Sequence, residues 1–102
     1  MIARIWHGVT SAEKADEYYQ FLQQSGIADY KLVEGNRGVQ VLQRIEGDKA
    51  HFLLITLWDS MDAIKRFAGD NPEKAKYYPE DKDYLLEFEE YVSHYDVLQN
   101  IS

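Results

Sequence analysis

Hydrophobic and polar residues alternate along the start of this chain in a pattern that predicts a strand followed by a helix. Residues 2–7 are rich in β-branched and aromatic side chains and are followed by Gly8, as is typical of a short first strand. Residues 10–13 have the spacing of a capping box, and hydrophobic residues then recur at helical intervals. Ser25-Gly26 predicts the end of this first helix.

A β-hairpin is expected in the middle of the chain. After an irregular segment at residues 35–38, residues 39–45 alternate between hydrophobic and polar, and Gly47-Asp48 can form a two-residue turn. The returning strand, residues 51–58, is hydrophobic at both odd and even positions. Both faces of this strand must therefore be covered in the folded protein.

Two further helices are expected in the second half. Ser60 can cap the first of them, which carries one hydrophobic stripe and ends at Gly69. A shorter helix is expected after Asp70 or Asn71, with Pro72 at its first position, until Pro79 breaks the pattern. Each of these boundaries depends only on local signals.

The last element, residues 88–98, has the aromatic and β-branched content of a strand. Tyr84-Leu85-Leu86 fits either a helical turn or the beginning of that strand. The order β-α-β-β-α-β predicts an α+β, ferredoxin-like fold with a four-stranded antiparallel sheet and both helices on one face. Since no helix remains to cover the other face, we expect a homodimer whose sheets pack together as a dimeric α/β barrel.

Length and charge narrow the possible classes of protein. A chain of 102 residues fits one domain, residues 1–102. The net charge of −7, with 11 basic residues scattered among 18 acidic ones, argues against a nucleic-acid partner. The chain has no cysteine, no signal-like start and no hydrophobic run long enough to cross a bilayer, so we expect a cytoplasmic protein with no membrane partner.

The chain resembles the antibiotic-biosynthesis-monooxygenase-like family of dimeric α/β-barrel proteins over about residues 1–98. The resemblance rests on Trp6 in the first strand, on Gly35-Asn36-Arg37-Gly38, and on Thr56-Leu57-Trp58-Asp59-Ser60 leading into Ala63-Ile64 and Phe67-Ala68-Gly69. Tyr77-Tyr78-Pro79 and His94-Tyr95-Asp96-Val97 are similar to a bacterial subgroup of that family. The resemblance implies chemistry of the kind found among its members, which include cofactor-free oxygenases of phenols and quinols and a branch that degrades haem.

The residues that define these activities in the family are replaced here. The haem-degrading branch uses an Asn late in the first strand, a Trp on the second helix and a His beyond it, where this chain has His7, Phe67 and Tyr77. The phenol oxygenases place a Trp and an Asn on one helix, where this chain has Phe67 and Ala63. Its three histidines also lack metal-ligand spacing, so we expect no cofactor and no metal.

His94 is the candidate catalytic residue. It lies inside the last strand, which borders the first strand in this topology. An imidazole that titrates near neutral pH could take a proton from a phenol and leave a phenolate able to give an electron to O2 without metal or flavin. The alternative is a core histidine whose hydrogen bonds are satisfied, and the sequence leaves both interpretations open.

Several other side chains are candidates for binding a substrate. A pocket for a planar aromatic ligand could be walled by Trp6, Trp58, Phe67, Tyr77 and Tyr78. Trp58 and Phe67 are more typical of an ordinary core, whereas the two tyrosines before Pro79 suit a rim or lid. His7 could line the mouth of a cleft or be a loop-edge histidine, and Arg37 could hold an anionic group or pair with a carboxylate.

Two classes of function remain. The first is a cofactor-independent monooxygenase acting on a small aromatic compound of the phenol or quinol type. The second is a non-catalytic small-molecule-binding or stress-response module with the same dimeric barrel fold. A ligand-dependent reaction that consumes O2 would separate the two classes.

Overall fold

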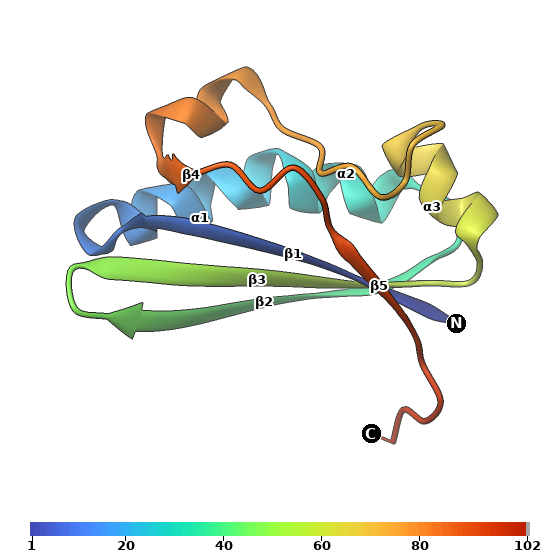
Figure 1. Cartoon of the computed structure of the whole chain (residues 1–102). Coiled ribbons are helices and arrows are strands. Elements are labelled where there is room, and N and C mark those ends of the chain that lie inside the picture. Colours follow the sequence, from blue (N-terminus) through green and yellow to red (C-terminus); the bar gives the residue numbers. More distant parts are fainter. Residues whose placement is uncertain (102) are drawn as a thin grey trace.

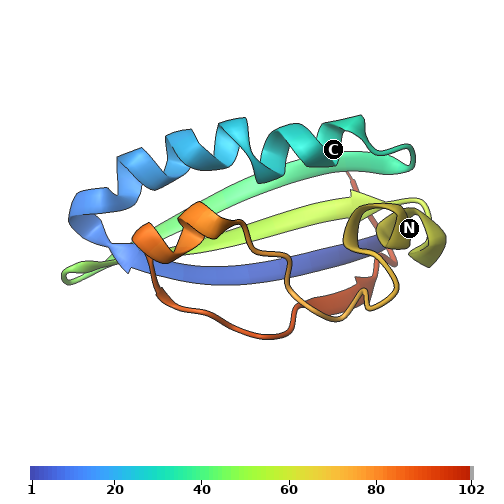
Figure 2. The same ribbon diagram turned by 90° about the horizontal axis from the view of Figure 1, so that it is seen from above.

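A computed structural model describes residues 1–101, and Ser102, the last residue of the predicted domain, lies outside the described part. One antiparallel sheet is covered on a single face by helices (Figures 1 and 2). The elements are β1 (Ile2–Ser11), α1 (Ala15–Gln24), α2 (Gly26–Leu32), β2 (Asn36–Glu46), β3 (Lys49–Trp58), α3 (Met61–Ala68), β4 (Leu85–Glu87) and β5 (Ser93–Asp96). Short 3₁₀ helices occupy Ala12–Lys14 and Pro79–Asp83.

β1 is an inner strand of the sheet, and the strand order is β2-β3-β1-β4, with β5 also paired to β1. On one side β1 pairs with β3 along its whole length. On the other side, β4 lies opposite Val9 and Thr10, and β5 lies opposite residues 2–5. The first and last strands therefore lie side by side. The predicted ferredoxin-like α+β fold is confirmed, but its sheet has five strands rather than the predicted four.

The burial of β3 decides which side chains face the helices. Its even-numbered residues from Ala50 to Trp58 are buried, and its odd-numbered residues from His51 to Leu57 are only half-buried. Since neighbouring side chains on a strand point to opposite faces, the even set packs under the helices. The odd set lies on the side without helices, which we call the open face.

The first helix begins later and extends further than its sequence signals predict. β1 continues to Ser11, whose side chain makes no capping hydrogen bond, and a 3₁₀ turn comes before α1. At Ser25 the helix is interrupted rather than ended, because the Ser25 hydroxyl donates to the carbonyl of Phe21 at 2.7 Å and α2 starts at the next residue. α2 then buries Ile27 and Tyr30.

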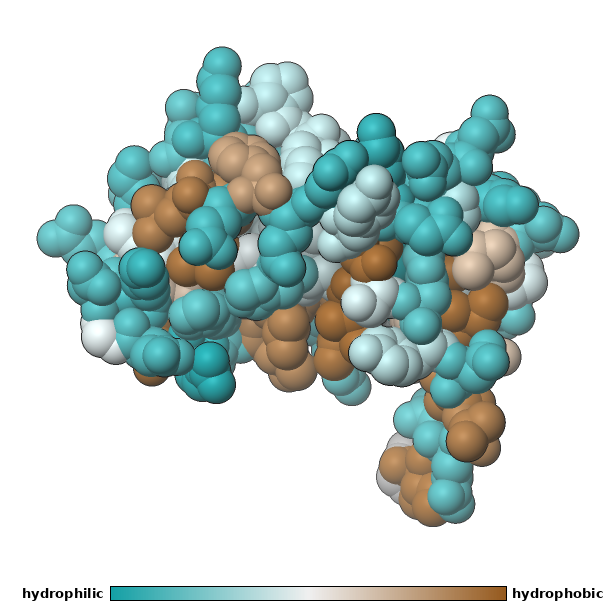
Figure 3. Space-filling view, viewed as in Figure 1, coloured by the Kyte–Doolittle hydropathy of each residue, from teal (hydrophilic) through white to brown (hydrophobic). Residues whose placement is uncertain are grey.

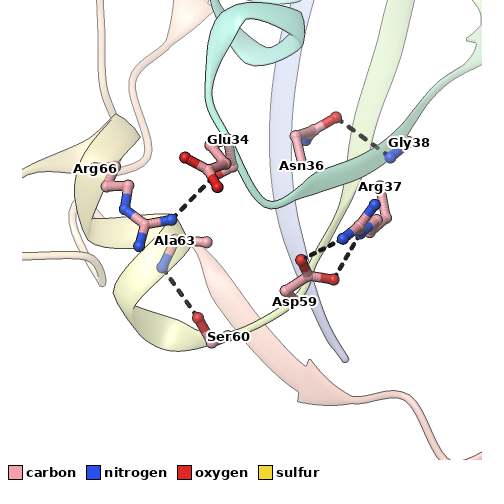
Figure 4. A network of polar contacts seen from close by, with 8 residues as sticks. All are labelled: Glu34, Asn36, Arg37, Gly38, Asp59, Ser60, Ala63 and Arg66. Atoms are coloured by element: carbon pink, nitrogen blue, oxygen red, sulfur yellow. Dashed lines mark hydrogen bonds and ion pairs between the residues drawn. The ribbon is translucent and has the colours of Figure 1, made fainter.

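The predicted boundaries of α3 are confirmed. The Ser60 hydroxyl accepts a hydrogen bond from the Ala63 N–H at 3.2 Å, which caps the helix (Figure 4). At the other end Gly69 has φ +86°, a left-handed conformation that favours glycine, and its N–H donates to the Lys65 carbonyl at 2.8 Å. The predicted stripe of hydrophobic residues is buried against the sheet.

The short helix predicted between Pro72 and Pro79 is wrong. This segment is irregular and pairs instead with residues 90–92, through hydrogen bonds from Ala75 N to Glu90 O at 2.9 Å and from Val92 N to Glu73 O at 2.8 Å. Its backbone groups thus find partners in a distant segment rather than in a helix. Pro79 begins a 3₁₀ helix, where its fixed φ suits the first turn.

The single last strand predicted at residues 88–98 is also wrong. Two short strands replace it, because residues 90–92 leave the edge of β1 to pair with residues 73–75. Of the two interpretations left open for Tyr84-Leu85-Leu86, the strand is observed for Leu85 and Leu86. Residues 70–92 therefore form a band beside β1 that is irregular except for the 3₁₀ helix and β4 (gold to red-orange in Figures 1 and 2).

Substitution of Ser60 tests whether its side chain stabilises α3 as an N-cap. We expect Ser60→Ala to lower the free energy of unfolding by about 1 kcal/mol, because the Ala63 N–H loses its acceptor. Ser11→Ala is the matched control, with an expected loss under about 0.5 kcal/mol, because the Ser11 side chain makes no capping bond. Urea unfolding, monitored by circular dichroism, measures the stability of both variants. Equal losses of stability would contradict the capping role of Ser60.

Candidate functional site

A narrow cleft lies between the sheet and the helices. Its walls come from β1, β3, the three α-helices, the 3₁₀ helix at Pro79–Asp83 and the segment before that helix. The residues that line it include Arg4, Trp6, Tyr18, Tyr30, Phe67, Lys76, Tyr77, Tyr78 and Asp81. Arg4 and Trp6 pair with Thr56 and Leu54, two buried even-numbered residues, so their side chains lie on the helix side. The cavity volume is about 20 Å³, enough for about one water molecule.

Trp6 is held by a chain of hydrogen bonds. Its indole Nε1 donates to the Tyr77 hydroxyl at 3.2 Å, and that hydroxyl donates to the Glu89 carbonyl at 2.6 Å. The two rings meet edge to face, with centroids 6.2 Å apart. The indole also lies across Gly8, where an added Cβ would come within 2.1 Å of it, so this position of the ring requires glycine.

Arg4 places a positive charge beside the cleft. Its side chain is only 2% exposed, and its Nη2 donates to the Lys74 carbonyl at 3.0 Å. Its guanidinium carbon lies 5.6 Å from the centre of the Phe67 ring. Burial lowers the pKa of this guanidinium and the Tyr30 hydroxyl opposes that shift, but an arginine remains charged in a protein. Its Nε has no hydrogen-bond partner among residues 1–101.

The tyrosines and Asp81 form a second polar group in the cleft. The Tyr78 hydroxyl donates to the Asp29 carboxylate, and the Tyr78 N–H donates to Asp81 Oδ2 at 2.6 Å. Burial raises the pKa of Tyr18, Tyr30 and Tyr78, and neighbouring carboxylates raise it further, although Arg4 opposes the shift at Tyr30. Burial also raises the pKa of Asp81, against the hydrogen bond from Tyr78. The hydroxyls therefore stay neutral and act as hydrogen-bond donors rather than bases.

His94 lies directly opposite Arg4 on the neighbouring strand and so on the same, helix-facing side. Its Nε2 is buried and has no hydrogen-bond partner within the described chain, but the residue does not line the cleft itself. Burial lowers the pKa of His94, the charge of Arg4 lowers it further, and Glu73 opposes this. The imidazole is therefore neutral at pH 7.

His7 lies on the open face rather than at the cleft, because it pairs with Leu53. Its Nδ1 is 2.5 Å from a carboxylate oxygen of Glu89, and its Nε2 is 3.1 Å from Nδ1 of His51. The two imidazole rings are stacked, with centroids 5.3 Å apart. His7 is thus separated from Trp6 by the thickness of the sheet.

Arg37 also lies away from the cleft, at the end of the sheet where β3 leads into α3 (Figure 4). Its Nε and Nη2 donate to the two carboxylate oxygens of Asp59 at 2.6 and 2.7 Å. This pairing raises the pKa of Arg37 and lowers that of Asp59, although both side chains are exposed. Of its two predicted roles, the structure shows the carboxylate pair.

The structure thus brings together four of the seven predicted site residues, Trp6, Phe67, Tyr77 and Tyr78. It adds Arg4, Tyr18, Tyr30 and Asp81, which the sequence analysis missed. Arg4 does carry a signal in the sequence, since it is a lone charge inside the hydrophobic run of residues 2–6. The two tyrosines carry none, because each is also an ordinary member of a helix's hydrophobic stripe.

Metal-binding and membrane-spanning features are absent from the described part of the chain. Among residues 1–101, no group of three or more His, Asp or Glu side chains could hold a metal ion. No helix within the same range is long and hydrophobic enough to cross a bilayer.

Comparison with known proteins identifies the class of fold. No model of a known protein family matches the sequence, and no curated protein matches it. The fold is similar to that of MhuD, a heme degrader from Mycobacterium tuberculosis with two hemes bound in its active site, with TM-score 0.66, 16% identity and complete coverage of both chains. A mutant of MhuD with two manganese protoporphyrin IX per active site gives TM-score 0.63 and 15% identity over 100% of this chain and 99% of that one.

A third similar structure connects the fold to the family named from the sequence. It is a Bacillus cereus protein described as a candidate antibiotic biosynthesis monooxygenase, with TM-score 0.63 and 16% identity over 99% of this chain and 96% of that one. The chain therefore has the fold of antibiotic-biosynthesis-monooxygenase-like proteins, and the predicted resemblance is confirmed at the level of fold.

The close approach of Trp6 to Gly8 can be tested by adding one methyl group. We expect Gly8→Ala to displace the indole and to lower the free energy of unfolding by about 1–3 kcal/mol. Urea unfolding and near-ultraviolet circular dichroism report the two effects.

Gly26→Ala is the matched control. A Cβ there would be 3.8 Å from the nearest side-chain atom, on Tyr30, which is an ordinary contact. Since Gly26 begins a helix, we expect an unchanged or slightly higher stability. A Gly8→Ala protein as stable as Gly26→Ala would show that Trp6 does not depend on Gly8.

Proposed function

We propose that this protein is a cofactor-independent monooxygenase that acts on a small aromatic compound of the phenol or quinol type, bound in the cleft. The observation that carries the proposal is a cleft walled by aromatic rings, including Trp6, Tyr30 and Phe67, with the buried charge of Arg4 beside it. Such walls favour a planar aromatic ligand, and the few polar groups would orient it. The fold shared with a candidate antibiotic biosynthesis monooxygenase supports the class of reaction.

His94 is proposed as the base. Loss of the phenolic proton makes the ring electron-rich enough to reduce O2, and a phenol plus O2 gives a quinone plus water, with all electrons supplied by the substrate. The lowered pKa of His94 leaves its imidazole unprotonated at pH 7 and ready to accept that proton, directly or through one water. Its position opposite Arg4 supports this role.

A ligand can enter only if the cleft widens. Benzene occupies engineered cavities of about 150 Å³, whereas this cavity holds about 20 Å³. The wall best able to move is the segment that carries Tyr77 and Tyr78, because residues 69–78 have no regular secondary structure. We propose that these two tyrosines form a rim that opens to admit the substrate.

The residues of the cleft do not fit haem. No histidine lines the cleft in residues 1–101, and the hydroxyls of Tyr77 and Tyr78 are engaged by Glu89 and Asp29. The cavity is also far smaller than the 300–1,000 Å³ or so of typical ligand pockets. The proposal for this chain therefore uses no haem, although the similar structures of MhuD contain hemes or a manganese porphyrin.

A non-catalytic binding module is the second candidate, and the position of His94 favours it. His94 does not line the cleft, and the carboxylate that does, Asp81, already accepts a hydrogen bond from Tyr78. The same aromatic walls would then hold a ligand without converting it.

Oxygen uptake separates the two candidates. With a panel of phenols and quinols, we expect ligand-dependent O2 consumption that persists after treatment with a chelator. We expect His94→Gln to lower turnover by about 10²–10⁴-fold with little change in ligand affinity. Because the pKa of His94 is lowered, the fall in turnover at acidic pH should occur below about pH 6.5.

His51→Gln is the control, since His51 lies on the open face. It should turn over at the wild-type rate. Ligand binding without O2 uptake would favour the binding module, and unchanged turnover in His94→Gln would remove His94 as the base.

We also infer a homodimer in which two open faces pack together. The hydrophobic side chains of this face are only partly covered, and Leu42 is 44% exposed. Hydrophobic atoms are visible along the side of the molecule away from the helices (Figure 3). The C-terminal segment also extends away from the helices, with Leu98 95% and Ile101 80% exposed (Figure 1). A second copy would cover both features.

A charge on the open face should prevent this dimer. We expect Ile55→Asp to raise the dimer dissociation constant by more than about 100-fold, because an unpaired carboxylate would be buried. Leu32→Asp is the control, since Leu32 is 85% exposed on α2. Sedimentation measures both variants, and a wild-type protein that is monomeric at micromolar concentration would contradict the inference.

A further inference from the structure

Arg4 carries a buried charge that no carboxylate neutralises. The side chain is 2% exposed, and none of the ion pairs found among residues 1–101 includes it. Its guanidinium has five N–H donors. Nη2 donates to the Lys74 carbonyl and the Tyr30 hydroxyl lies against the guanidinium, but Nε has no partner in that range. A buried charge without a countercharge is costly, so the position calls for an anionic or strongly polar ligand.

A second buried nitrogen lies next to this charge. His94 is directly opposite Arg4 in the β1–β5 register, on the same face of the sheet, and its Nε2 also has no partner among residues 1–101. Arg4 Nε can only donate a hydrogen bond, whereas a neutral imidazole nitrogen can accept one. A hydroxyl group has the matching pair of functions, since its oxygen accepts and its proton is donated.

The charges around the cleft favour an anion in spite of the net charge of −7. Lys76 lies over the Phe67 ring at 4.5 Å and adds a second positive charge to the lining. Asp81 is the acidic residue that lines the cleft, and the Tyr78 N–H already occupies one of its oxygens. The other titratable neighbours are Tyr18 and Tyr30 from the helices, Tyr77 and Tyr78 from the segment before the 3₁₀ helix, and Glu73, which acts on His94.

We infer that Arg4 binds the phenolic oxygen of an aromatic ligand and stabilises its phenolate form, with His94 as the neighbouring proton acceptor. This inference rests on the proposed function and names the ionised state in which the ligand is held. In the step itself, the O–H bond of the ligand breaks, its proton moves to the His94 imidazole, and the electron pair stays on the oxygen beside Arg4. No oxidant is required for this step.

The ionisation of a bound phenol can be followed without turnover. 4-Nitrophenol is the probe, because its phenolate absorbs at longer wavelength than its neutral form and its electron-poor ring resists oxidation. We expect the bound probe to ionise at a pH at least about one unit below that of the free probe. We expect Arg4→Gln to abolish this shift and to weaken binding by about 10- to 100-fold.

Arg66→Gln is the matched control. Arg66 is exposed on α3 and donates to the Glu34 carbonyl, away from the cleft (Figure 4). The same substitution there should leave the ionisation of the probe and its affinity unchanged. Equal effects of the two variants would overturn the inference, because the response would then reflect net charge alone.

The wild-type protein gives a test that does not depend on the folding of Arg4→Gln. We expect 4-nitrophenol to bind at least about tenfold more tightly than 4-nitroanisole, its methyl ether, which has no phenolic proton. Equal affinities, or a bound probe that stays neutral, would overturn the inference. Tighter binding of 4-nitrobenzoate than of 4-nitrophenol would also overturn it, by assigning the Arg4 site to carboxylates.

These outcomes are separable from those of the oxygenase proposal. An ionised probe in a protein that consumes no O2 with any phenol would support the role of Arg4 and contradict the monooxygenase. O2 uptake by a protein that binds the probe only in its neutral form would support the monooxygenase and contradict the role of Arg4.

Discussion

The register of β1 within the sheet is the constraint on which the rest of the structure depends. Because side chains alternate along a strand, this register puts Arg4, Trp6 and Gly8 on the helix side and His7 on the open face. A shift of one residue would exchange these two sets. β3 holds the register along one edge of β1, and β4 and β5 hold it along the other. The cleft and the open face are thus two consequences of a single alignment.

Residues 69–78 complete the cleft because they do not form a helix or a strand of the sheet. Their backbone hydrogen bonds join residues 73–75 to residues 90–92, which leaves Tyr77 and Tyr78 free to pack against β1 and α1 instead of lying on a helix. The Trp6 indole and the Glu89 carbonyl both bond to the Tyr77 hydroxyl, so this band is tied to the central strand. The segment that closes the site is therefore held by these hydrogen bonds rather than by a helix or a strand of the sheet.

The electrostatics of the cleft differ from those of the whole chain. The protein has a net charge of −7, yet the cleft combines the buried charge of Arg4 with Lys76. Desolvation lowers the pKa of Arg4 and of the neighbouring His94 and raises that of Asp81. Neutral hydroxyls, a neutral imidazole beside the cleft and the positive charges of Arg4 and Lys76 together favour a ligand that can give up a proton.

The sequence by itself determined the elements whose signals are local: β1, the β2–β3 hairpin, and α3 between Ser60 and Gly69. It also showed that β3 is hydrophobic on both faces, and it identified four aromatic side chains of the cleft as candidate binding residues. Only the tertiary structure decided that the even-numbered residues of β3 face the helices and that residues 73–75 pair with residues 90–92. It also placed Arg4 opposite His94. The physical reason is that these features depend on pairing between segments up to about 90 residues apart, and such pairing overrides weak local preferences.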